Sequence, residues 1–156
     1  MADKSARPAA SSIVGGLDSM FQQRGPSPGR EDDEAVSLPG PGDDYRAAGR
    51  PANHAIPRLH FILGDRTISF CQYAELTSFG KFFPATGGTG ESFILYFNGR
   101  VPMEILVEGR NLWAIFDYIS VHRLPWVREL LKGRDFEDER ASVIHRITIR
   151  PVTQEP

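Results

Sequence analysis

The chain has 156 residues, a length typical of one domain with appendages rather than of two separate cores. Its formal charge is −2, with six basic and eight acidic residues up to Pro57 and twelve of each after it. The neutral C-terminal part argues against a protein that attracts nucleic acid through its overall field, and a single cysteine excludes a disulfide framework and a thiolate metal cluster.

The N-terminus lacks the apolar stretch of a secretory signal, and no run of about eighteen apolar residues is present to span a membrane. We therefore expect a cytoplasmic protein with no membrane partner. The preference for Arg over Lys, together with many Ala, Gly and Pro residues, suits a GC-rich bacterial genome.

Residues 1–57 are predicted to form a disordered leader, because residues 24–57 are rich in Pro, Gly and acidic side chains and offer little apolar surface. Within the leader, residues 11–23 contain apolar side chains at helical spacing, among them Leu17 and Phe21. Two interpretations stay open for this run. It is either a random cluster in a flexible tail or a short amphipathic motif that folds in a partner's groove.

A single folded domain is predicted over residues 58–152, followed by a tail at 153–156. Apolar residues alternate over 59–63 and again at Ile68 and Phe70, and Gly64-Asp65-Arg66 between them indicate a turn. This pattern predicts a first hairpin. Apolar residues spaced by three then follow over 72–80, which fits either a short helix or a bulged strand.

Residues 84–90 are predicted to form a loop, because they contain three glycines and a proline. The segment superficially resembles a phosphate-binding loop. However, Glu91 stands near the place of the required Lys, and a strand rather than a helix follows. Alternating apolar residues over 93–97 and 101–107 predict a second hairpin, joined by Asn98-Gly99 in a type I′ turn.

A helix is predicted next, with Asn111 as its N-cap and apolar residues such as Leu112 and Ile115 along one face. Pro125 ends or kinks this helix, and residues 126–131 predict a second, shorter helical stretch. Residues 142–152 predict a final strand, with His145 on the same face as the apolar residues at 143, 147 and 149. The predicted fold is thus α+β, an antiparallel sheet of about five strands with one main helix packed on one face.

Three residues around the predicted helix are candidates for ligand binding. Arg110 and Asn111 lie at a strand-to-helix turn, where the N-terminus of a helix favours anions. His122, at the other end of the helix, is a candidate general base with Glu108 or Asp117. In the simpler interpretation Asn111 caps the helix, Arg110 is solvated and His122 stabilises the helix C-terminus.

Trp126, flanked by Arg123 and Arg128, is the candidate anchor for a protein partner, because Trp and Arg are enriched at interface hot spots. The alternative is that Trp126 fills the end of the sheet and the arginines face water. Cys71 is either a nucleophile paired with His60 or His145, or a buried small apolar residue, and the second interpretation is favoured.

These patterns favour a small protein-interaction or regulatory module with no cofactor and no metal, and they lean against an enzyme. The first alternative is an enzyme or small-anion binder that uses Arg110 together with His122. A second alternative, a weak nucleic-acid binder, requires four basic residues to converge on one strip. These are Arg123, Arg128, Arg146 and Arg150.

Overall fold

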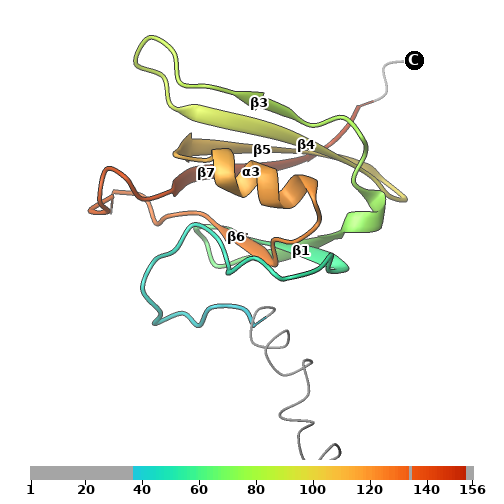
Figure 1. Cartoon of the computed structure of the whole chain (residues 1–156), viewed down its shortest axis with the longest axis horizontal. Coiled ribbons are helices and arrows are strands. Elements are labelled where there is room, and N and C mark those ends of the chain that lie inside the picture. The colour runs from blue at the N-terminus through green and yellow to red at the C-terminus, as the bar shows by residue number, and fades with distance from the viewer. Residues whose placement is uncertain (1–36, 134, 154–156) are drawn as a thin grey trace, which may run out of the picture. The chain divides into compact units, whose positions relative to one another are not determined.

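A computed structural model describes residues 37–133 and 135–153. The predicted motif at 11–23, with Leu17 and Phe21, lies outside the described residues, as do residues 154–156 of the predicted tail. Within the described part, no helix combines the length and the apolar character needed to cross a bilayer. The elements of the described residues are, in chain order, β1 (Arg58–Ile62), β2 (Ile68–Gln72), the 3-10 helix η2 (Tyr73–Glu75), β3 (Lys81–Phe83), β4 (Glu91–Asn98), β5 (Pro102–Arg110), α3 (Trp113–Ser120), β6 (Trp126–Arg128) and β7 (Val143–Pro151) (Figure 1).

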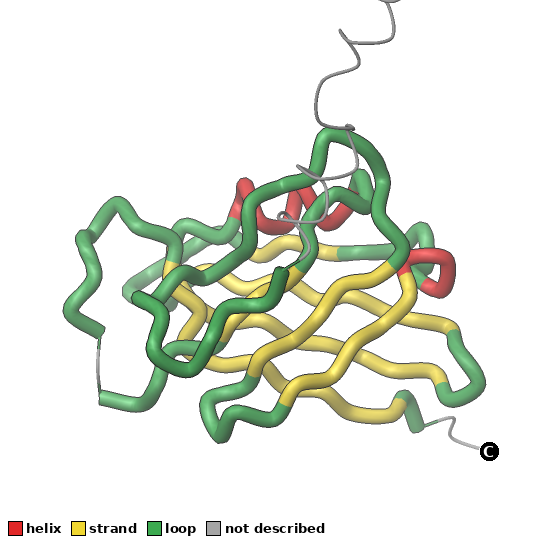
Figure 2. The backbone as a smooth tube through the Cα atoms, turned by 90° about the horizontal axis from the view of Figure 1, so that it is seen from below, coloured by secondary structure: helices red, strands yellow, loops and turns green. Residues whose placement is uncertain are grey.

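The strands form two sheets, ordered β2-β1-β6 and β3-β4-β5-β7. The α+β class is confirmed, but the single antiparallel sheet of about five strands is wrong. Figure 2 shows the two sheets one behind the other, with strands running in different directions. The apolar inner faces of both sheets, together with one face of α3, supply the core. Its buried members include Leu59, Phe61, Phe93, Leu95, Phe97, Ile105, Val107, Ile115, Ile119, Val127 and Ile147.

The second helical stretch predicted after Pro125 is a strand instead. β6 pairs in parallel with β1, with His60 opposite Trp126. On its other side, Gly49 N donates to Trp126 O at 3.0 Å and Arg128 N donates to Ala47 O at 2.8 Å. Because both edges of these three residues find backbone partners, sheet pairing prevails over the helical spacing of their apolar side chains.

Both predicted hairpins form, as β1–β2 and β4–β5. The type I′ turn at Asn98-Gly99 is wrong, because neither residue has the positive φ that this turn requires. Asn98 pairs with Pro102, so three residues connect the strands. Between the hairpins, the undecided segment 72–80 becomes η2 and an isolated bridge from Leu76 to Phe97, and it leads into β3, which the sequence did not predict.

A β-bulge changes the predicted face of His145. The register between β5 and β7 shifts between Glu108 and Gly109, so that Gly109 pairs with Ile144 while Glu108 pairs with Arg146. Ile144 is therefore turned into the core and His145 is exposed, contrary to the simple alternation expected for this strand.

Residues 37–57 pack against the domain, so the predicted leader extends too far toward the C-terminus. Ala47, Ala52 and Ile56 are buried in the core. Ala52 N donates to Arg123 O and Ile56 N donates to His122 O, both at 2.8 Å. Small side chains and backbone hydrogen bonds hold this segment, and a composition rich in Pro, Gly and Ala does not reveal such contacts.

Candidate functional site

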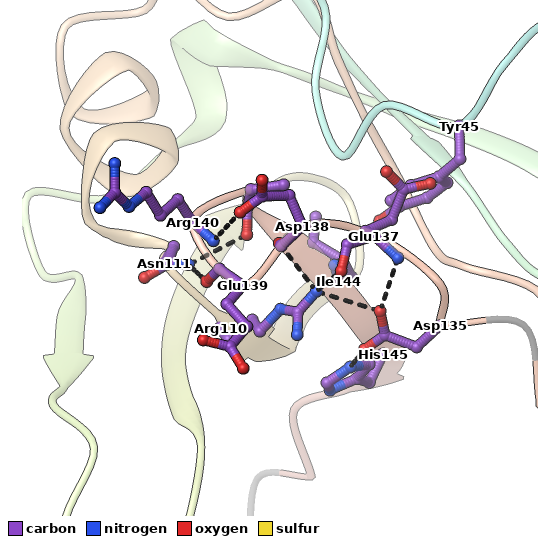
Figure 3. Close-up of polar contacts among 11 residues, drawn as sticks. Tyr45, Arg110, Asn111, Asp135, Glu137, Asp138, Glu139, Arg140, Ile144 and His145 are labelled. Carbon is purple, nitrogen blue, oxygen red and sulfur yellow. Dashed lines mark hydrogen bonds and ion pairs between the residues drawn. The ribbon is translucent and has the colours of Figure 1, made fainter.

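Arg110 and Asn111 organise the loop 135–141 rather than an open ligand site (Figure 3). Arg110 Nη2 donates to Asp135 Oδ1 at 3.0 Å and to the backbone oxygens of Glu137 and Asp138 at 3.1 and 3.2 Å. Asn111, in the left-handed region at φ 53°, donates its amide to the oxygens of Glu139 and Ala141. Nη2 of Arg110 and the amide of Asn111 are thus engaged within the chain, whereas Nε of Arg110 is buried without a hydrogen-bond partner among the described residues.

The N-terminus of α3 is also occupied. Glu91 Oε2 accepts a hydrogen bond from Leu112 N at 2.5 Å, and the helix begins at Trp113. Asn111 is therefore not the N-cap, and its predicted capping role is wrong. The carboxylate of Glu91 takes the favourable position for an anion at this helix end.

The structure does not bring His122 and Arg110 together, because they flank opposite ends of α3. His122 follows the C-terminus with φ 60°, and its ring stacks on Tyr73 with centroids 4.8 Å apart. Instead Asp135 joins Arg110 to a different histidine, His145, whose Nε2 lies 3.0 Å from Asp135 Oδ2. The hydrogen bond with His145 is the largest cause that lowers the pKa of Asp135, and the charge of Arg110 lowers it further.

An open cleft of about 900 Å³ lies beside this cluster. One wall is the glycine-rich loop that ends at Gly90, and the other is the segment 130–133. Ser92 and Glu108 line it from neighbouring strands. The strand ends approach closely here, because a Cβ on Gly90 would meet Gly109 O at 2.6 Å.

The cleft contains a histidine oriented by a carboxylate, an arrangement that suits proton transfer. Among the described residues, however, no Ser, Thr or Cys side chain is hydrogen-bonded to His145. The same residues hold no group of three or more His, Cys, Asp or Glu side chains placed to bind a metal ion. Neither a catalytic triad nor a metal centre is assembled by this part of the chain.

The residues predicted to anchor a partner serve the fold. Trp126 is 5% exposed and its Nε1 donates to Ser37 O at 3.2 Å, so its side chain is part of the fold and is not presented to a partner. The arginines beside it do not simply face water, because Nη1 of Arg128 is buried. Arg123 Nε donates to Ala52 O at 2.6 Å. The backbone oxygen of Arg128 accepts from the hydroxyl of Tyr45 at 3.1 Å.

Of the two tryptophans, Trp113 is the exposed one, and the sequence did not identify it as a site residue. It is 59% exposed and stands edge-on to Phe82, with ring centroids 5.2 Å apart. Trp113 lies at the start of the helix and outside the apolar stripe that contains Ile115 and Ile119. This position in the sequence pattern predicts an exposed side chain.

Cys71 lies on β2, where burial and then the nearby Glu75 raise the pKa of its thiol to about 11. A high pKa disfavours the thiolate that a nucleophile requires. No hydrogen bond joins Cys71 to His60 or His145 in the described part of the chain. The favoured sequence interpretation, a buried small apolar residue, holds only in part, because Cys71 is half-buried and packs against the core.

The edges of the two sheets differ in how they are protected. β6 is covered by the bridge from Ala48 to Val127. β7 carries the bulge, His145, Arg146, Arg150 and Pro151, and β3 has three residues that include Lys81. β2, with the sequence Ile-Ser-Phe-Cys-Gln, has no charge, proline or bulge and pairs only with β1 among the described strands.

The chain matches no protein-family model, and comparisons with curated proteins and with solved structures give no significant match.

Proposed function

We propose that this domain is a protein-interaction module that binds an extended segment of a partner by adding it as a strand to β2. The observation that carries the proposal is the unprotected edge of this strand. Natural proteins commonly guard sheet edges with charges, prolines, bulges or covering segments. β2 contains no charge, proline or bulge, and no described strand pairs with its outer edge. Strand addition to such an edge is a recurring mode of peptide recognition.

The backbone of β2 has the alternation that strand addition requires. Leu63 N donates to Thr67 O at one end of the β1–β2 pair, and Tyr73 N donates to Pro57 O at the other. Thr67 and Tyr73, the residues on the β2 side of these two hydrogen bonds, both have odd numbers. Along an antiparallel strand, the N–H and C=O groups of successive residues point alternately toward one neighbouring strand and the other. Ile68, Phe70 and Gln72 therefore direct their N–H and C=O groups away from β1, toward an incoming strand.

Two of these residues, Ile68 and Phe70, present exposed apolar side chains beside that edge. Ile68 is 50% exposed and Phe70 is 53% exposed. The guanidinium of Arg58 lies 5.0 Å from the centroid of the Phe70 ring, and the ring of His60 lies 5.5 Å from it. Apolar and aromatic side chains opposite one another stabilise a strand pair, so the expected partner segment is extended and has such residues at alternate positions.

Selection of displayed ten-residue peptides on the full chain tests this proposal. The peptides are then measured against Ile68→Lys/Phe70→Lys, which introduces charges at the edge. The matched control is Phe136→Lys, because Phe136 is 90% exposed and lies in a loop. We expect selected peptides to lose at least tenfold in affinity for the double variant and to keep their affinity for the control.

Amide spectra locate the bound peptide. The N–H groups of Ile68, Phe70 and Gln72 should exchange with solvent faster than those of Ser69 and Cys71 in the free protein, and slow down in the complex. Peptides that bind the double variant as well as the unmodified chain, or that protect other amides, would overturn the proposal. A selection that yields no peptide sensitive to the double variant has the same consequence.

A further inference from the structure

The charged residues that line the cleft beside Asp135 and His145 fall into two groups. Some already form hydrogen bonds or ion pairs within the domain, and others do not. Asp135 is paired with Arg110 and His145. Glu91 accepts the hydrogen bond from Leu112 N. Two of the three carboxylates that line the cleft are thus engaged within the domain.

The two flexible cations of the cleft, Lys132 and Arg146, are exposed and make no ion pair with the described residues. Arg146 stands opposite Glu108 in the β5–β7 register, yet their charged atoms are not within ion-pair distance. The cleft side chains without a hydrogen bond or ion pair to the described residues therefore include two cations, the carboxylate of Glu108 and the hydroxyls of Thr86 and Ser92.

We propose that this cleft binds a small oxyanion, a carboxylate or a phosphate that also carries a hydrogen-bond donor. Arg146 and Lys132 neutralise the oxyanion, and Arg146 offers the paired N–H groups that suit carboxylate and phosphate geometry. Glu108 accepts from the donor of the ligand. A cleft of about 900 Å³ is within the range of small-molecule sites.

The loop that forms one wall leaves the cleft open to such a ligand. Gly87 and Gly88 have φ values of 57° and 86°, and a Cβ on either would meet nothing within 4 Å. The hydroxyl of Thr89 donates to Thr86 O at 2.6 Å, and both residues line the cleft. The site is separate from β2 and is independent of strand addition there.

Titration of the full ¹⁵N-labelled chain with inorganic phosphate and with glycolate tests the proposal, with sodium chloride at equal ionic strength as the reference. Both probes combine an oxyanion with a hydroxyl donor. We expect saturable amide shifts at Ser92, Glu108 and Arg146, and a rise of at least tenfold in Kd for Arg146→Gln. Arg100→Gln is the matched control, because Arg100 is exposed in the β4–β5 connection and does not line the cleft.

Lys132→Gln provides a second variant, since it changes a cleft cation outside the sheet, and it should also weaken binding. Saturable shifts with one probe alone identify the oxyanion class. Shifts that stay linear with concentration, that chloride reproduces, or that persist with unchanged Kd in both Arg146→Gln and Lys132→Gln would overturn the inference.

Discussion

The indole Nε1 of Trp126 donates a hydrogen bond to the backbone oxygen of Ser37 at 3.2 Å, across 89 positions of the sequence. This contact ties β6 to the first described residue of the chain. Gly49 lies directly under the indole, since a Cβ there would be 2.6 Å from Nε1. Trp126 therefore joins the three-stranded sheet to the segment that precedes it.

Trp126→Ala should destabilise the domain by about 3–5 kcal/mol, because it removes a buried aromatic side chain and leaves a cavity. Trp113→Ala is the comparison, and its cost should be much smaller because Trp113 is mostly exposed. Urea denaturation of both variants measures the difference. Equal losses would contradict the assignment of one tryptophan to the core and the other to the surface.

Tyr45→Phe should cost about 1–3 kcal/mol, because the hydroxyl links two otherwise separate backbone groups. It accepts from Ile144 N at 2.9 Å and donates to Arg128 O at 3.1 Å. Burial raises the pKa of this phenol to about 12, so the group remains neutral over the usual pH range. A variant as stable as the parent in urea would show that segment 37–57 contributes little through this residue.

Gly109→Ala should be among the most damaging single substitutions, with a loss of about 3 kcal/mol or more. A Cβ at this position would lie 1.9 Å from Val143 O, so β7 must move away from β5. Gly42→Ala is the matched control, because a Cβ there meets nothing within 4 Å. Similar melting temperatures for the two variants would contradict the close approach of these strands.

The hairpins and the main helix could be predicted from the sequence because their signals are local. Alternation at Leu59 and Phe61, and helical spacing at Ile115 and Ile119, report burial on one face of an element without reference to the rest of the chain. β6 could not be predicted in this way. Its extended form depends on backbone partners at Ala47 and Gly49, which are distant in sequence.

The arrangement of the candidate ligand site could not be predicted either, because its contacts join residues that are distant in sequence. Arg110 was identified because it precedes a helix, but its partner Asp135 lies 25 positions away in a charged loop. His145 reaches that carboxylate only because the bulge between Glu108 and Gly109 turns it outward. A one-residue shift of register has no signature in the apolar alternation of either strand.

The pair formed by Asp135 and His145 should give the domain an acid-sensitive contribution to stability. Folding lowers the pKa of Asp135, so the folded state binds this proton less readily than the unfolded state. The contribution is complete above the ordinary pKa of the carboxyl, and it is lost as the pH falls through the lower pKa of the folded state.

Asp135→Asn keeps an oxygen that can accept from Arg110 but carries no titrating charge. The unfolding free energies of the parent and of this variant, measured in urea from pH 7 down to pH 2, should therefore differ by a steady amount above about pH 4, and the difference should shrink as the pH falls further. A difference that stays constant over this range would show that the carboxylate does not stabilise the fold through its charge.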